Sequence, residues 1–484
     1  MHSKGLKELL QKYQNLSNPI KASIWFAICN MLQRGISLIS TPIFTRLLTT
    51  DEYGVFTVYQ SWYNIIAVFA TLNLYCGVFN NGLMKFSANK AKFVSSMQGL
   101  STTATVVLFL VYACNMDFWN SLFGLSSLFV MLIFVELLFV PAYQFWGVQQ
   151  RYEFKYKSLV IVTLAMTIAS PVIGVIAVLS TTYKAEARVL SYVLIQVFIG
   201  LVLYVYNMIR GKTFFSKEYW KFALGFNIPL IPHYLSQIIL QQSDRIMINS
   251  MVGTGASAIY GVAYTIGMLM QMITNAIVSS YTPYSYQKLE AKDYYSIRKT
   301  ANSLLLFVGV CCLMVVVVGP EVVALIAPSE YADAMWIIPP VSISVYFMFM
   351  YNLFSGVEFF FELTKFSMIA SCSAAGVNVV LNYIFIKLYG YIAAGYTTLV
   401  CYLLYALAHG ILCQWVARKK TDCKEIYDNK AIIVFSLVII GLMIGITFLY
   451  RYTIVRWLLV AAAVILAFVK RRDLVAFAKS MQKR

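Results

Sequence analysis

Fourteen long apolar stretches dominate the sequence, and each is long enough to cross a membrane. A spanning helix needs about 20 mostly apolar residues. Lipid offers the backbone no hydrogen-bond partner, so each stretch must form a helix that satisfies its own N–H and C=O groups. The short alternating segments of a membrane barrel are absent from the sequence. The stretches lie near 22–44, 55–76, 97–114, 122–145, 158–179, 190–209, 222–247, 258–283, 300–319, 335–357, 366–386, 391–416, 431–449 and 453–469.

The composition excludes a soluble protein. Sixty per cent of the 484 residues are hydrophobic and 12% are charged, whereas a soluble domain has about 45–50% apolar and about 25% charged residues. The loops between the stretches are short, which leaves no room for a nucleotide-binding or other extramembrane domain. We therefore predict an all-α polytopic membrane protein with about 14 transmembrane helices.

The basic residues predict the orientation. Of the 38 Lys and Arg residues, 30 fall on the side of the N-terminus, and Arg34 lies within the first stretch. Because cytoplasmic loops are enriched in Lys and Arg, we expect both termini in the cytoplasm and an even number of spans, either 12 or 14. This distribution explains the net charge of +18 without a nucleic-acid partner. The seven basic residues on the other side are Arg46, Lys184, Arg188, Arg245, Lys387, Arg451 and Arg456.

An internal repeat predicts two halves. Tyr53-Gly54-Val55 and Tyr260-Gly261-Val262 each follow a short polar loop and open a span. Six spans separate the copies, so the repeats are parallel, as in transporters whose halves enclose a cleft. The predicted order is an amphipathic cytoplasmic N-terminus over 1–21, a six-helix bundle over 22–209, a cytoplasmic linker over 210–221, a second six-helix bundle over 222–416, a cytoplasmic loop over 417–430, two additional helices over 431–469 and a basic cytoplasmic tail over 470–484.

Five ionisable residues within the stretches are candidates for substrate binding: Arg34, Glu136, His233, Asp244 and Arg245. A charge at mid-membrane depth costs at least about 2.5–3.5 kcal/mol, so each needs a partner or a water-filled cavity. The planar guanidinium of arginine fits phosphate oxygens, which predicts a cationic cavity for a phosphate-bearing substrate. The alternatives are a structural pair of Arg34 with Glu136, and a His233 that bonds only to the backbone.

Pro229 and Pro232 predict a helix break in the seventh stretch, because proline removes a backbone hydrogen bond. Discontinuous helices mark the binding sites of many transporters.

The sequence offers no metal, cofactor or catalytic motif. There is no C-x-x-C pair, and three histidines do not form a zinc-protease motif. Gly211-Lys212-Thr213 lacks the earlier glycine of a phosphate-binding loop. We expect a secondary transporter with no cofactor, driven by an H⁺ or Na⁺ gradient, rather than an enzyme.

Four motifs resemble the Wzx-type flippases of O-antigen and polysaccharide, within the multidrug/oligosaccharidyl-lipid/polysaccharide (MOP) exporter superfamily to which the MATE transporters belong. The similarity covers roughly residues 20–415, with one departure, because Ala394-Gly395 reverses the usual order. The matching motifs are R-x-L-x-x-x-E-Y-G at 46–54, P-x-x-P followed by D-R-x-x-I at 229–232 and 244–248, I-Y-x-x-A at 259–263, and N-x-x-L-N followed by G-x-x-G-A at 378–382 and 390–395.

The resemblance implies two six-helix bundles forming a V, with two extra helices, in the bacterial inner membrane. It implies movement of an undecaprenyl-diphosphate-linked oligosaccharide, the repeat unit of O-antigen (for lipopolysaccharide) or of capsular or exopolysaccharide, from the inner to the outer leaflet by alternating access. Membrane lipids, a polysaccharide polymerase and a chain-length regulator are the partners it implies.

Three alternatives stay open at this stage. A multidrug or cation exporter of the same superfamily would use acidic and aromatic groups, whereas here Arg34 and Arg245 balance Glu136 and Asp244. A membrane polymerase or ligase would need a large outer loop, and the longest here is short and acidic. A lipid II flippase is the third alternative, and only the sequence motifs distinguish it from a polysaccharide flippase.

Overall fold

The computed structural model describes residues 18–361 and 363–470. In these ranges the chain forms α-helices and short 3₁₀ turns, with no strand. The predicted amphipathic N-terminus and basic tail lie almost entirely outside the described residues. The chain divides into two compact units, Met1–Ala258 and Ile259–Arg484, and each is described by itself.

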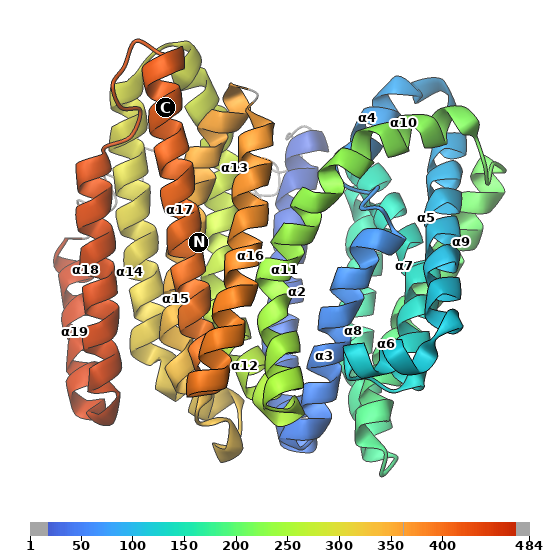
Figure 1. Ribbon diagram of the computed structural model, residues 1–484, viewed down its shortest axis with the longest axis horizontal. Coiled ribbons are helices and arrows are strands. Elements are labelled where there is room, and N and C mark those ends of the chain that lie inside the picture. Colours follow the sequence, from blue (N-terminus) through green and yellow to red (C-terminus); the bar gives the residue numbers. More distant parts are fainter. Residues whose placement is uncertain (1–17, 362, 471–484) are drawn as a thin grey trace, which may run out of the picture. The chain divides into compact units, whose positions relative to one another are not determined.

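The first unit contains most of the predicted first seven spans (Figure 1). Its spans are long helices, and shorter helices and turns connect them. These elements are α2 (Asn18–Leu47), α3 (Thr50–Ala70), α4 (Val78–Lys85), η1 (Ser87–Asn89), α5 (Lys90–Cys114), α6 (Met116–Phe123), α7 (Ser127–Tyr152), α8 (Tyr156–Leu179), α9 (Lys184–Gly211), α10 (Lys217–Asn227), η2 (Ile228–Leu230), α11 (Ile231–Met251) and the start of α12 (Thr254–Gly267).

The second unit surrounds a central helix, α15, which packs against α13, α14, α16, α17 and α18. Most side chains of α15 are buried, as expected of a span covered by neighbours on all sides. After α12, the elements are α13 (Leu269–Glu290), α14 (Tyr294–Ile326), η3 (Ser329–Tyr331), α15 (Ala334–Phe360), α16 (Thr364–Tyr389), α17 (Ala393–Lys420), α18 (Asn429–Phe448), η4 (Leu449–Arg451) and α19 (Thr453–Val469).

The polytopic all-α membrane fold is confirmed. Each of the fourteen predicted stretches coincides with a long helix or a broken pair of helices among the described residues. By length and apolarity, ten of the described helical segments are able to cross a membrane, or eleven when α12 and α13, bent by 40°, are taken as one span. Many apolar side chains on these helices are exposed, including Ile161, Phe198 and Leu437, which suits contact with lipid.

The boundary between the two compact units lies later in the chain than the predicted boundary between the two bundles. The repeat places residues 222–247 with the second bundle, whereas α10 and α11 belong to the first unit. The reason is packing, since α10 contacts α4 and α5 and α11 runs along α3. The assignment of six helices to each functional half stays a prediction.

Both loops that precede the repeated Tyr-Gly-Val triplets meet within the first unit. Asp51 Oδ1 accepts hydrogen bonds from the Thr254 hydroxyl at 2.6 Å and from the Gly255 amide at 2.8 Å, so it caps the first turn of α12. A Cβ on Gly54 would lie 2.1 Å from the Thr254 carbonyl oxygen. The Asp-Glu-Tyr-Gly motif therefore supplies a cap and a residue small enough for close backbone approach.

Gly54→Ala tests this contact. We expect a loss of about 1–3 kcal/mol, because the added methyl collides with backbone rather than with a flexible side chain. Thermal unfolding of the detergent-solubilised protein measures the loss. The matched control is Gly376→Ala in α16, where a Cβ meets nothing within 4 Å. Equal stability of the two variants would show that the α3–α12 contact is looser than described.

Candidate functional site

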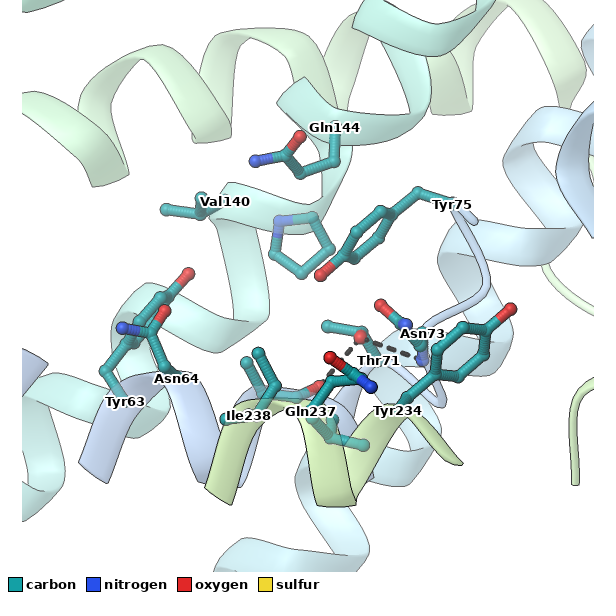
Figure 2. Close-up of a pocket in the computed structure, with 13 residues that line it drawn as sticks. Tyr63, Asn64, Thr71, Asn73, Tyr75, Val140, Gln144, Tyr234, Gln237 and Ile238 are labelled. Atoms are coloured by element: carbon teal, nitrogen blue, oxygen red, sulfur yellow. Dashed lines mark hydrogen bonds between the residues drawn. The ribbon is translucent and has the colours of Figure 1, made fainter. Parts of the chain in front are cut away.

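A pocket of about 220 Å³ lies within the first unit. It is bounded by α3, α7, α11 and the loop that follows α3. Figure 2 shows Gln144 and Gln237 on opposite sides of the space, with the Tyr75 hydroxyl directed into it. The lining consists of Tyr63, Asn64, Ala67, Val68, Thr71, Asn73, Tyr75, Val140, Pro141, Gln144, Tyr234, Gln237 and Ile238.

The loop after α3 is held in a defined turn. The Thr71 hydroxyl donates to the Ala67 carbonyl at 2.7 Å and accepts from the Asn73 amide at 3.1 Å. Leu72 and Asn73 both have φ of 49°, a left-handed conformation that asparagine tolerates well. Asn227, at the end of α10, donates to the Leu72 carbonyl at 2.7 Å. These bonds place Thr71, Asn73 and Tyr75 at the pocket.

Helix periodicity places the remaining lining residues. On α7, Val140 and Gln144 are four residues apart and share one face. Pro141 beside them leaves the Leu137 carbonyl without its usual helical donor. On α11, Tyr234, Gln237 and Ile238 follow the same spacing.

The pocket is uncharged and contains several hydrogen-bonding side chains. None of its lining residues is Asp, Glu, Lys, Arg or His. Amide groups of Asn and Gln both donate and accept hydrogen bonds, and the tyrosines add hydroxyls and ring faces. A larger hollow in the second unit, between α16 and α17, has a mostly apolar lining. The first pocket is therefore the candidate site for a ligand rich in hydroxyl groups.

Glu136 lies on α7, two turns from Gln144, and is 1% exposed. Its carboxylate accepts a hydrogen bond from the Tyr59 hydroxyl at 2.8 Å. Tyr63, one turn further along α3 than Tyr59, lines the pocket. Glu136 therefore lies next to the pocket but does not line it, and its role in substrate binding stays a prediction.

Arg34 belongs to α2, but its side chain lies outside the described residues. The alternative pairing of Arg34 with Glu136 is therefore not tested. His233, at the start of α11, is half-buried and its ring lies 6.0 Å from that of Tyr234. Its neighbour Tyr234 faces the pocket, whereas His233 is not among the lining residues.

Asp244 and Arg245 lie two turns beyond the pocket on α11. Asp244 is fully buried. An Arg245 guanidinium N–H donates to Gln242 Oε1 at 3.0 Å, and the Arg245 carbonyl accepts from the Ser257 hydroxyl. About eight residues of helix separate Arg245 from Gln237, which is roughly 12 Å along the axis. The charged candidates and the uncharged pocket are thus adjacent but distinct.

The predicted break around Pro229 and Pro232 coincides with η2, the 3₁₀ turn between α10 and α11. Pro229 lies within this turn and Pro232 opens α11. A hinge role for these prolines stays a prediction.

Comparison with known proteins identifies the family. The model of the family described as "Polysaccharide biosynthesis protein" matches residues 20–289, which is more than half of the chain. The chain belongs to the polysaccharide biosynthesis protein family. The MatE model also matches, over residues 229–384.

One relative matches most of the chain. The "Lsg locus putative protein 1" of Haemophilus influenzae is 21% identical over 367 residues, which cover 73% of this chain and 87% of the relative. The part of the predicted resemblance that is confirmed by the family match is membership of a polysaccharide biosynthesis family.

Solved structures show the same fold. A lipid II flippase, MurJ, in an inward closed conformation has a TM-score of 0.68 at 15% identity, and covers 93% of this chain and 100% of its own. An inward-facing MATE multidrug transporter of the MOP superfamily has a TM-score of 0.56 at 16% identity, covering 83% and 100%. A MOP-superfamily transporter from Pyrococcus furiosus has a TM-score of 0.53 at 15% identity, covering 84% and 98%.

The sequence analysis missed the pocket residues. Single Asn, Gln and Tyr residues within apolar helices carry no pattern of their own, and residues 63 and 237 come together only when α11 packs on α3. The available signal is the concentration of uncharged polar residues on one face of α3 and α11.

Substitutions at Glu136 separate its structural role from its predicted binding role. Glu136→Leu leaves the Tyr59 hydroxyl buried without an acceptor, so we expect a loss of about 1–3 kcal/mol. Glu136→Gln keeps an acceptor oxygen and should cost less than half of that. Thermal unfolding measures both variants. If Glu136→Gln is stable but inactive in transport, the carboxylate charge acts on the substrate. Equal destabilisation by both substitutions would contradict the described Tyr59 bond.

Proposed function

We propose that this protein is a flippase that moves an undecaprenyl-diphosphate-linked oligosaccharide from the inner to the outer leaflet of the bacterial plasma membrane. The observation that carries the proposal is an uncharged pocket, rich in amides and tyrosines, inside an apolar helical unit of the polysaccharide biosynthesis family.

The chemistry of the pocket suits a sugar. Moving a hydroxyl into an apolar medium without a partner costs several kcal/mol, and an oligosaccharide has many hydroxyls. Gln144, Gln237, Asn64 and the three tyrosines offer donors and acceptors to replace water. A volume of about 220 Å³ is below the roughly 300–1,000 Å³ typical of small-molecule pockets. The pocket therefore holds a part of the head group, in the order of one sugar ring, rather than the whole repeat unit.

The diphosphate needs cationic groups. Arg34 and Arg245 are the proposed partners, because arginine stays charged and binds phosphate oxygens through two N–H groups at once. A cationic cavity for the head group, from which the polyprenyl chain extends into the bilayer, is part of this proposal. The concentration of Lys and Arg on one side of the spans supports cytoplasmic termini, and an H⁺ or Na⁺ gradient is the proposed energy source. A polymerase and a chain-length regulator are the proposed partners.

A cation or multidrug exporter is the second candidate, favoured by the MatE match over residues 229–384. A site for an organic cation needs a carboxylate in contact with the ligand. Glu136 is bonded to Tyr59 and does not line the pocket, and this favours a neutral, hydroxyl-rich ligand over a cation.

Complementation tests the function. A strain that lacks the gene should accumulate the lipid-linked saccharide on the inner leaflet, and the wild-type gene should restore the outer-leaflet pool and surface polysaccharide. Export of a cationic dye without any change in the lipid-linked pool would support the second candidate and overturn the first.

Substitutions of the pocket amides test the site. Gln144→Leu and Gln237→Leu keep side-chain size and remove hydrogen bonds worth about 0.5–1.5 kcal/mol each, so we expect each to reduce outer-leaflet delivery several-fold. Gln149→Leu is the matched control, because Gln149 lies on the same helix outside the pocket and bonds to Glu153. Unchanged delivery in both pocket variants would show that the saccharide binds elsewhere.

A further inference from the structure

The second unit contains a buried acid and a buried imidazole in direct contact. Glu358 on α15 and His409 on α17 are 0% and 1% exposed. His409 Nδ1 lies 2.7 Å from Glu358 Oε1. Glu358 Oε2 accepts a hydrogen bond from the Ser367 hydroxyl on α16. Three helices thus converge on one carboxylate.

The pair is enclosed by aromatic rings. The Tyr405 ring lies 4.6 Å and the Tyr351 ring 5.5 Å from the imidazole, measured between centroids. The Tyr405 hydroxyl shares a 2.6 Å hydrogen bond with Ser371 on α16. Among the described residues, neither Glu358 nor His409 makes an ionic contact with any other charged side chain.

The other titratable groups near the pair are thiols and phenols. Cys413, one turn beyond His409 on α17, interacts electrostatically with Glu358, and Tyr281 of α13 and Tyr427 interact with Cys413. On α14, Cys312 faces Tyr346. Lys430 of α18 is exposed. The side chains of Glu362 and Lys365 lie outside the described residues.

The two protonation states of this pair differ in net charge and in the hydrogen bonds that they satisfy. With a neutral ring that donates Nδ1–H, the carboxylate leaves a net charge of −1 in a dry interior, which is costly. A second proton at Nε2 makes a neutral imidazolium–carboxylate pair. His409 Nε2 is buried and has no hydrogen-bond partner among the described residues, so an N–H there is itself unsatisfied. In the neutral ring, Nε2 is instead an acceptor without a partner, so neither protonation state satisfies every group of the pair.

We propose that the Glu358–His409 pair is a binding site for one proton, and that this proton is exchanged during the transport cycle. The coupling to transport rests on the proposed function, whereas proton binding does not. The pair lies where a short loop joins α15 to α16, since Glu358 is two residues from the end of α15 and Ser367 is in the first turn of α16. Separation of these helix ends admits water to Nε2, and their closure removes it.

Proton binding is measured directly on the full chain. The sequence has three histidines, His2, His233 and His409, so ring-¹⁵N-histidine labelling in nanodiscs gives few NMR signals, and His409→Gln assigns one of them. Spectra are recorded between about pH 5 and about pH 9, and we expect the ring shifts of His409 to change with pH as a proton is exchanged. Glu358→Gln should alter this response, because the carboxylate that contacts His409 Nδ1 is gone.

The result that overturns the proposal is a set of His409 ring shifts that does not change across this range in the wild type. A pH response that Glu358→Gln leaves unchanged would overturn the role of the pair. The wild-type spectra give the response itself, and His409→Gln serves only to assign the signal.

Transport in proteoliposomes tests the coupling. Wild-type protein should move a lipid-linked saccharide at a rate that depends on an imposed pH gradient, and His409→Gln should lose that dependence. Tyr405→Phe is the matched control, because it keeps the ring against His409 and should keep the dependence. Wild-type movement without gradient dependence would reject the coupling and leave the flippase standing. If the protein moves no lipid-linked saccharide although the His409 ring exchanges a proton, the proposed function is rejected and the proton site stands.

Discussion

The interior of a bilayer offers no hydrogen-bond partner, and the rest of this structure follows from that constraint. Apolar side chains cover the helices that contact lipid, and polar side chains turn inward to bond with one another. Asn207 of α9 donates to Gln98 of α5 at 3.0 Å and to the Ala142 carbonyl of α7 at 3.3 Å. Such bonds hold helices together. A pocket that gathers amides and tyrosines within the helices offers hydrogen-bonding groups to a ligand.

The two units each bury a carboxylate, but they neutralise it differently. Glu136 in the first unit accepts from Tyr59, which holds its own proton and adds no positive charge. Glu358 in the second unit contacts His409, an imidazole that is able to bind a second proton. The first arrangement is suited to a fixed structural role beside the pocket, and the second to the proton exchange that we propose. In this proposal, substrate recognition and energy coupling belong to different units.

The sequence predicts the fold well because each span is identified by its own local apolarity, independent of its neighbours. The helix break at Pro229 follows from the covalent chemistry of proline in the same way. The motif around Asp51 and Gly54 is visible in the sequence, but its structural role is not. Asp51 caps a helix and Gly54 allows a close contact, both at Thr254, which lies about 200 residues further along the chain.

The candidate site was only partly accessible to sequence analysis. Charged residues such as Glu136 stand out in apolar helices because their burial is costly, so they were singled out first. Uncharged residues such as Gln144 and Gln237 differ less from their apolar neighbours in the sequence. Their common pocket exists only once α7, α3 and α11 are assembled. Glu358 and His409 are 51 residues apart on different helices, and nothing local to either indicates the other.

The most direct measurement of the central claim is a cryo-EM structure of the full chain in nanodiscs with a lipid-linked saccharide bound. The account predicts density for a sugar ring within hydrogen-bond distance of Gln144 and Gln237, with the diphosphate outside the pocket. Saccharide density that contacts neither glutamine, or a pocket that stays filled with water while the lipid is bound elsewhere, would contradict it.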